Sequence, residues 1–381
     1  MKIEESDAKK SLHKAGPEMR CEVGHEFKDV FKAKMSHWSS FLNADPLPWL
    51  LEEDNPSVRY FTLVDILGVS ARDKRAIAAR KAIMEKGAVP EILAKQKARG
   101  YWEKAEDFYI RTKYKGTVWQ LIILAELGVD GGDPRIKRAC DFVLQGSQDR
   151  QSGGFAYVGG PAGGGYHSGV IPCLTANMVW SLIRLGRFGD PRVKQGVEWI
   201  TTFQRFDDGI DEAPKGWPYE KRENCWGKHT CHSAAAKAIK ALTEIPEKER
   251  SAEVKRTIEA AAEYFLRHRI FKRSRDLSKV VKPKWVKFGF PTMWDGDALE
   301  VFGILTRSGL RDPRMQDAAD LVLSKQDSRG RWNLENTYNG RFQVNIEKKG
   351  KPSKWVTLIA LRALKQYFSP PSSDPLKKVP S

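Results

Sequence analysis

The chain has 381 residues, 41% of them hydrophobic and 10% aromatic, so it is long enough to bury one large core or two ordinary ones. The N-terminus is charged and no run of about 18 apolar residues occurs, so we expect neither a secretory signal nor a membrane span. Five cysteines without paired spacing favour reduced thiols over a disulfide framework, and we therefore expect a cytoplasmic protein.

The formal net charge of +17 favours an anionic partner, such as nucleic acid, an anionic membrane surface or a phosphorylated substrate. The basic residues are scattered along the chain and no nucleic-acid-binding motif occurs, so nucleic acid is not expected. Peripheral association with an anionic membrane stays open, and no feature of the sequence demonstrates a partner subunit.

Composition divides the chain into a mobile N-terminal tail (1–24), a helical domain (25–368) and a mobile C-terminal tail (369–381). Within the domain, similar openers recur at spacings of 57–61 residues, each before an apolar-periodic stretch. An acid or serine suits the N-cap position, and the proline that follows it in three of them suits the first helical position, so each opener predicts a helix start. The openers begin at Asp73, Asp133, Asp190, Ser251 and Asp312, and residues 25–43 are a sixth candidate helix of this kind.

A second and more apolar helix follows each of these helices after a glycine or aromatic turn. Small and aliphatic residues occupy most of its faces, which predicts that it is buried. The six helices of this second kind begin near Ser57, Gly116, Cys173, Cys231, Asp295 and Lys354. No strand-like alternation competes with this pattern, so the sequence predicts an all-α protein, a closed double ring of helix pairs with repeats of about 60 residues.

The order of outer helix, turn and inner helix, together with turn segments such as Gln148-Asp-Arg-Gln-Ser-Gly-Gly-Phe155, resembles the terpenoid-cyclase and protein-prenyltransferase superfamily over residues 45–368. The resemblance implies an α6/α6 toroid and a small apolar substrate such as an isoprenoid. In such a toroid the inner helices run parallel, so their N-termini gather at one mouth. We expect the functional site there, because helix N-termini stabilise thiolates and anions.

Basic, thiol and aromatic side chains near that mouth are candidates for binding an apolar or phosphorylated substrate. They are Arg111, Lys113, Trp119, Cys173, Trp180 and Trp294. The alternative is that the basic residues form a solvated rim, and that the aromatic residues and the cysteine are packed in the core.

Two cysteines and two histidines fall within eight residues, in Cys225-Trp-Gly-Lys-His229-Thr-Cys231-His232. Thiolate and imidazole are ligands that Zn²⁺ prefers, so this segment is a candidate zinc site, unless the cysteines are simply packed and the histidines cap a helix. His229-Thr-Cys231 and Asp295-Gly-Asp297 resemble the zinc-binding segments of protein prenyltransferases, although an aspartate replaces one cysteine, and Cys231-His232 resembles the Cys-His pair of lanthipeptide cyclases. The metal ligands implied are Cys225, His229, Cys231, His232 and Asp295.

Trp294-Asp-Gly-Asp297-Ala298-Leu-Glu also resembles part of the aspartate-rich segment that supplies the proton donor in squalene-type cyclases. Asp297 matches the donor, whereas Ala298 replaces the aspartate that neighbours it. The alternative is that Asp297 only caps the helix that follows.

Three functions therefore remain open. The favoured one is a zinc-dependent transferase, lyase or cyclase in which Asp297 or His167 acts as acid or base and zinc activates a thiol, a water or a carbonyl. The second is a metal-free terpenoid cyclase with Asp297 as the proton donor. The third is a non-catalytic toroid that binds an apolar or anionic ligand.

Overall fold

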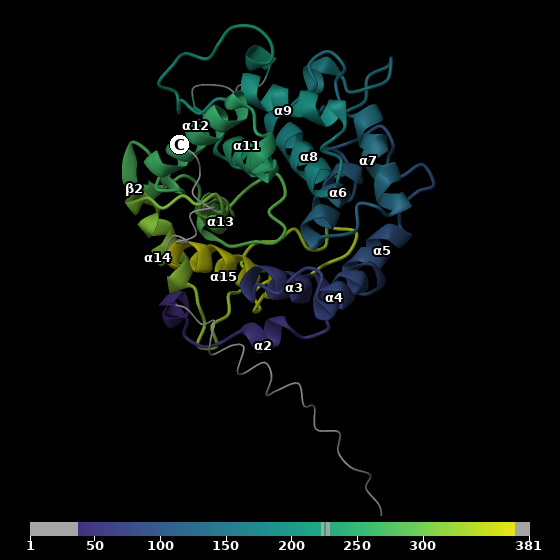
Figure 1. Cartoon of the computed structure of the whole chain (residues 1–381). Helices are drawn as coiled ribbons and strands as arrows, with labels where there is room; N and C mark the ends of the chain where they lie inside the picture. The colour runs from purple at the N-terminus through teal and green to yellow at the C-terminus, as the bar shows by residue number, and fades with distance from the viewer. Residues whose placement is uncertain (1–36, 222–224, 226–228, 370–381) are drawn as a thin grey trace, which may run out of the picture. The chain divides into compact units, whose positions relative to one another are not determined.

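The computed structural model describes residues 37–221, 225 and 229–369. Both expected tails therefore lie outside the described residues, apart from Ser369, and so do residues 25–36 of the sixth candidate outer helix. The described residues are mostly helical, with one two-stranded sheet, and they form two concentric layers of helices (Figure 1). None of the described helices is both long and apolar enough to cross a membrane.

Six helical segments form the inner ring, and each begins within a few residues of its predicted start. They are α3 (Pro56–Phe61) with the π-helical turn Thr62–Ile66, α6 (Thr117–Leu127), α8 (Pro172–Arg184), α11 (His232–Glu244), α13 (Ala298–Arg307) and α15 (Lys354–Phe368). Neighbours in this order pack on one another, and α15 packs on both α13 and α3, which closes the ring (Figure 1). Between α3 and α6 the contact is close: a Cβ added at Gly128 would lie 2.6 Å from the Phe61 ring.

Each inner helix carries an outer partner. The outer helices are α4 (Lys74–Glu85), α7 (Pro134–Gly146), α9 (Pro191–Phe203), α12 (Ala252–Arg267) and α14 (Gln316–Ser324), and the short 3-10 helix His37–Phe41 packs on α15 in the sixth position. Two further short helices, α2 (Leu47–Leu50) and α5 (Ala88–Ala94), lie between these elements in the chain. The chain is thus an α6/α6 double ring, as the repeats predict.

The recurrent openers act as helix caps. The side chain of Asp133, for example, accepts a hydrogen bond of 2.8 Å from the backbone N of Arg135, and the Arg135 guanidinium lies 2.7 Å from the same carboxylate. This ion pair and the backbone bond lower the pKa of Asp133, so the cap is ionised at neutral pH and complements the helix dipole. The same geometry recurs at Asp73, Asp190 and Asp312, while Ser251 accepts from the backbone N of Val254.

The fold is all-α as predicted, apart from one small element that the sequence pattern does not indicate. Strands β1 (Lys272–Arg273) and β2 (Asp276–Val280) form an antiparallel hairpin between α12 and α13, in which Lys272 pairs with Val280. The residues of this hairpin are half-buried or exposed, so it shows no alternation of apolar and polar residues.

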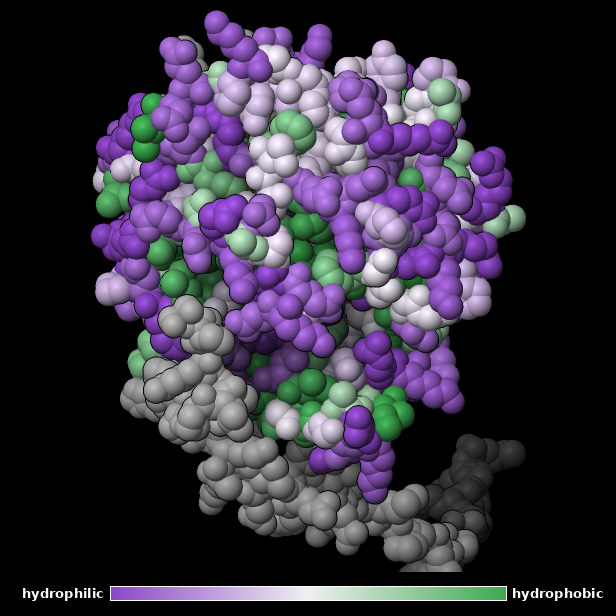
Figure 2. Space-filling view, turned by 45° about the horizontal axis from the view of Figure 1, so that its top comes forward, coloured by the Kyte–Doolittle hydropathy of each residue, from purple (hydrophilic) through white to green (hydrophobic). Residues whose placement is uncertain are grey.

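Hydrophilic side chains cover most of the face shown in Figure 2, with hydrophobic ones in small patches and hollows between them.

Candidate functional site

A cavity of about 590 Å³ lies inside the helix ring. The residues that line one end of it come from the last turns of the inner helices, among them Glu126, Arg184, Glu244 and Arg307. Because these C-terminal turns meet at one mouth, the inner helices run parallel, as expected. The mouth of the cavity is nevertheless at the helix C-termini, which is the end opposite to that expected for the functional site.

The floor of the cavity reaches the N-terminal end of α13 and carries Asp297. The carboxylate of Asp297 caps α13: one oxygen accepts from the backbone N of Glu300 and the other from that of Gly289, both at 2.8 Å. Only 3% of Asp297 is exposed. Burial, and next the charge of Glu300, raise the pKa of Asp297 to about 7, although the two backbone hydrogen bonds oppose the shift. Asp297 is therefore an acid that holds its proton close to neutral pH.

A buried ion-pair network stands beside Asp297. The Lys237 Nζ atom lies 2.7 Å from a Glu300 carboxylate oxygen, and the Lys240 Nζ atom lies 2.9 Å from the other. Thr292 donates a hydrogen bond of 2.7 Å to Glu300, and Lys240 also pairs with Glu126 of α6. Burial alone would raise the pKa of Glu300, but the two lysines outweigh it and lower this pKa to about 2. The network therefore keeps a negative charge fixed next to Asp297.

Sequence reasoning missed this network. Its signal was present in α11, where Lys237 and Lys240 interrupt an alanine-rich inner helix at a spacing of three residues. Two lysines on a helix that is otherwise buried require carboxylate partners, because an unpaired buried charge is costly. The partners, Glu126 and Glu300, come from helices that lie far apart in the sequence.

Trp180 is the one predicted substrate-binding residue that lines the described cavity. Its indole N–H donates to Glu244 at 3.3 Å, and the Lys240 Nζ atom lies 4.0 Å from its ring centroid. Phe61 and Phe290 add two further aromatic walls.

Three of the other substrate-binding candidates come together at the N-terminal mouth, outside that cavity. The Trp294 ring lies 4.9 Å from the Lys113 Nζ atom, and its indole N–H donates to the Tyr114 hydroxyl at 2.9 Å. The Cys173 Sγ atom lies 3.3 Å from the Tyr109 hydroxyl, and burial raises the pKa of this thiol to about 11. Of the remaining two, Trp119 is fully buried against Tyr109, and Arg111 is exposed.

His167, the second acid-base candidate, lies on a short 3-10 helix (His167–Gly169) and does not line the cavity around Asp297. Its Nδ1 atom is 2.7 Å from a carboxylate oxygen of Asp149, and its ring stacks on Trp217 at 4.2 Å. These contacts fix the orientation of the histidine in the loop before α8.

The expected zinc ligands do not come together as a set. Within the described parts of the chain, no three His, Cys, Asp or Glu side chains are placed to hold a metal ion. His232 is fully engaged, because its Nε2 donates to the carbonyl of Ile270 and its Nδ1 accepts from the Tyr264 hydroxyl. Burial lowers the pKa of His232 to about 3, so the ring is neutral and no lone pair remains for a metal.

Asp295 is likewise committed elsewhere, since it accepts a hydrogen bond of 2.9 Å from the Ser233 hydroxyl and pairs with Lys284. His229 is exposed, and its Nδ1 atom lies 3.4 Å from the carbonyl oxygen of Asp208. Cys225 and Cys231 are half-buried, and residues 222–224 and 226–228 around Cys225 lie outside the described residues. His232 and Asp295 are therefore corrected from metal ligands to structural residues, and we derive no step through zinc.

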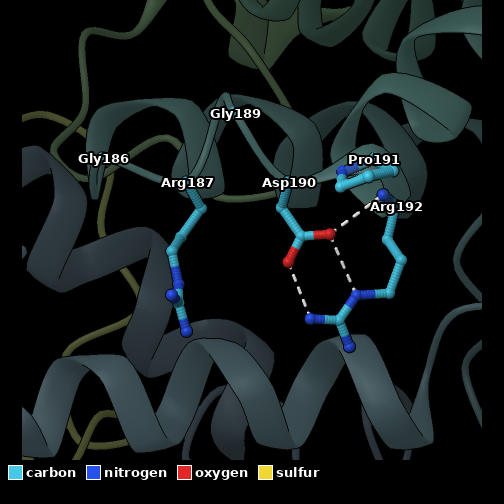
Figure 3. Close-up of a pocket in the computed structure, with 6 residues that line it drawn as sticks. All are labelled: Gly186, Arg187, Gly189, Asp190, Pro191 and Arg192. Atoms are coloured by element: carbon cyan, nitrogen blue, oxygen red, sulfur yellow. Dashed lines mark hydrogen bonds and ion pairs between the residues drawn. The ribbon is translucent and has the colours of Figure 1, made fainter.

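A second depression, of about 580 Å³, lies on the turn that leads into α9 (Figure 3). It is lined by Gly186, Arg187, Gly189, Asp190, Pro191 and Arg192. Asp190 and Arg192 face one another as a cap and its ion pair, and Arg187 pairs with Asp141 of α7. Its charges are thus used within the fold, and the turn is a helix opener rather than a site.

Comparisons with known proteins give structural likenesses only, because no protein-family profile and no curated protein matches the chain. One similar structure is the type II terpene cyclase MstE from Scytonema, a variant in complex with its substrate geranylgeranyl dihydroxybenzoate. It is 13% identical to this chain with a TM-score of 0.29, and the match covers 72% of this chain and 94% of that chain. A protein from Actinoplanes is 14% identical with a TM-score of 0.30, covering 75% and 99%. The double ring described above rests on this chain's own helix contacts.

Proposed function

We propose that the protein is an enzyme whose reaction begins when Asp297 protonates a small molecule held in the ring cavity. The observation that supports this proposal is a cavity-lining carboxyl group that is buried and has a pKa of about 7. An acid of this strength is protonated in a large fraction of molecules near neutral pH, which is what general-acid catalysis requires. The sequence resemblance makes a terpenoid-type cyclisation the reaction to test first.

In such a reaction the Asp297 O–H adds its proton to a carbon–carbon double bond, and the resulting cation is closed by a second double bond. The product forms when this cation loses a proton to water, and the Asp297 carboxylate recovers a proton from solvent. The backbone N–H groups of Gly289 and Glu300 already face the carboxylate, so they stabilise its charge after the proton has left. Glu300 is not the donor in this scheme, because its two lysine partners keep it ionised.

The walls of the cavity supply three aromatic rings, from Phe61, Trp180 and Phe290. Their π-faces can stabilise a cationic intermediate without providing a nucleophile that would trap it. Phe290 is held in place by Trp355, on which it stacks with a centroid separation of 4.2 Å.

The test is incubation of the purified protein in D₂O with linear polyprenes, squalene and geranylgeraniol, followed by gas chromatography and mass spectrometry. We expect a cyclised product that carries one solvent-derived deuterium, and we expect Asp297→Asn to abolish it. The isosteric variant keeps the shape of the side chain but has no carboxyl proton to give. A product that forms equally well with Asp297→Asn would remove Asp297 from the mechanism.

Zinc binding is retained as a separate proposal on Cys225, His229 and Cys231, which the described part of the chain does not bring together as a three-ligand metal site. Its support is that thiolates are preferred zinc ligands. In addition, Cys225 lies close enough to Tyr109 for its charge to raise the pKa of that hydroxyl, and Cys231 does the same to the pKa of Cys173, which is 3.3 Å from Tyr109. Zinc bound there would supply a Lewis acid. Plasma mass spectrometry should find about one zinc per chain in the wild type and none in Cys225→Ser/Cys231→Ser. Equal zinc contents in the two proteins would refute this assignment.

A further inference from the structure

The mouth of the ring cavity is lined by four arginines, Arg184, Arg250, Arg307 and Arg362. Arg184 and Arg307 are the final residues of α8 and α13, Arg362 lies on α15, and Arg250 precedes α12. Among the side chains that line this mouth, only Asp65 and Glu244 are carboxylates that pair with them. Glu247, which does not line the cavity, acts on Arg250, so four guanidinium groups meet three carboxylates and one positive charge is in excess. Arg250 also donates to the carbonyls of Ile245 and Thr243.

The preference of helix C-termini for basic residues explains one arginine at the end of a helix, but not the convergence of several. Arg184 and Arg307 share Glu244, at 3.2 and 3.6 Å from its carboxylate oxygens. Both lie close enough to Arg362 for their charges to lower its pKa, in addition to the larger effect of burial. The guanidinium groups at the mouth therefore repel one another, and a bound anion would relieve that repulsion.

Donor groups at the mouth also lack acceptors. The Nε atom of Arg362 is buried without a hydrogen-bond partner, and the 3.6 Å contact with Glu244 is the only ion pair that Arg307 makes with a described residue. Arg362 and Arg184 both lie over the ring of Phe61, at 4.7 and 5.9 Å from its centroid, which holds their planes at the cavity wall. Planar guanidinium groups with unused N–H donors match the oxygens of phosphate or carboxylate.

The space below the mouth is continuous along α13. Helix α13 is ten residues long and runs from the floor, capped by Asp297, to Arg307 at the mouth, a distance of about 15 Å at 1.5 Å per helical residue. Gly303 lines the middle of this path and has no side chain, and a Cβ added there would have only the Ala363 Cβ atom within 4 Å. A chain-like ligand therefore has room between the mouth and Asp297.

We propose that the four arginines at the mouth bind the anionic head group, a phosphate or carboxylate, of a small molecule whose uncharged part extends along α13 towards Asp297. That this molecule is the substrate rests on the proposed function. The anion site itself is independent of any proton transfer by Asp297.

Isothermal titration calorimetry at constant ionic strength and pH 7.5 tests the proposal with two probes, inorganic phosphate and octyl phosphate. We expect saturable binding of both, with octyl phosphate at least about tenfold tighter, because its alkyl chain leaves water. Arg307→Gln/Arg362→Gln should weaken both about tenfold or more, since each arginine supplies charge-assisted hydrogen bonds. Arg307→Gln alone is the second variant: this side chain is 55% exposed, so we expect its replacement to leave the fold intact and still to weaken both probes.

The control is Arg72→Gln, which removes the same charge from an exposed residue outside the cavity and should leave affinity unchanged. Gly303→Leu should weaken octyl phosphate but not phosphate, because it fills only the path below the mouth. The proposal fails if no saturable binding occurs, if Arg72→Gln weakens binding as much as the mouth variants do, or if Gly303→Leu leaves octyl phosphate unaffected. Asp297→Asn should bind both probes normally, so a failure of the acid mechanism is distinguishable from a failure of the anion site.

Discussion

At the scale of single residues, the pKa of Asp297 is set by opposing effects of its surroundings. Burial and the fixed charge of Glu300 hold its proton, while two backbone N–H groups stabilise the carboxylate that remains when the proton leaves. Because Lys237 and Lys240 keep Glu300 ionised, the acid and the fixed charge are different carboxyl groups a single helical turn apart. Environments that push the pKa values of two neighbouring carboxyls apart are a general means of assigning an acid role.

The raised pKa of Asp297 predicts a specific dependence of stability on pH. The folded chain binds this proton more tightly than the unfolded chain, so the stabilisation is fully present below pH about 4 and is lost as pH rises to about 7. The free energy of unfolding of wild type, relative to Asp297→Asn, should therefore fall by up to about 1.4 kcal/mol per pH unit across this range. Urea denaturation of both proteins at pH 4, 5.5, 7 and 8 measures this difference in the free energy of unfolding. A difference that does not change with pH would contradict the raised pKa.

The residues of the site also show what the sequence could and could not predict. The segment around Asp297 identifies this aspartate and its place at a helix start, because capping is a local property. The local pattern of α11 contains the two lysines but not their partners, since Glu126 and Glu300 reach them from α6 and α13. His232 matches a metal-binding motif in the sequence, but both of its ring nitrogens form hydrogen bonds within the fold. Their partners are Tyr264 of α12 and Ile270 in the loop after it, which the local sequence around His232 does not reveal.

At the scale of elements, the helix openers carry most of what could be foreseen. Four openers encode an aspartate cap, a helix start and a paired arginine within three residues, and the fifth has a serine cap; all five fall at observed N-caps of outer helical segments. The hairpin β1–β2 was not foreseen, because no buried face gives it a period of two. The described cavity opens at the C-terminal end of the inner helices, whereas the sequence led us to expect the functional site at their N-terminal end.

The caps make a quantitative prediction for α7. Asp133→Ala removes the acceptor for the backbone N of Arg135 and the partner of the Arg135 side chain, so it should lower the free energy of unfolding by about 1 kcal/mol. Asp133→Asn keeps the capping oxygen and should recover most of this loss. Chemical denaturation of the three proteins decides the matter; equal destabilisation by alanine and asparagine would show that the ion pair, not the cap, matters.

The link between α11 and α13 gives a second prediction at this scale. Lys237→Met places an apolar chain of similar length where a fully buried ammonium group pairs with Glu300, and it leaves that carboxylate with one lysine fewer. We expect a loss of about 3 kcal/mol in the free energy of unfolding, the lower end for breaking a buried pair, because Lys240 still contacts Glu300. Lys81→Met on the outer helix α4, where the lysine side chain is 79% exposed, is the matched control and should change stability by less than about 0.5 kcal/mol. A loss below 1 kcal/mol for Lys237→Met would mean that the pair contributes little.

At the scale of the whole molecule, the ring places charge in two tiers. The inner tier of Lys237, Lys240, Glu126 and Glu300 is balanced, whereas the arginine tier at the mouth carries excess positive charge. An anionic molecule would be drawn to the mouth by this excess, and its uncharged part would meet the balanced tier and the acid below. The closed ring thus positions an acid at one end of a path and a cationic entrance at the other.

The central claim is that Asp297 is a protonated acid near neutral pH inside the helix ring. A ¹³C NMR titration of aspartate-labelled protein measures it directly, with the Asp297 carboxyl resonance assigned by its absence in Asp297→Asn. The structure predicts a titration midpoint near pH 7 for this resonance. A midpoint below about 5, close to the usual range of aspartate, would contradict the role of Asp297 as a proton donor.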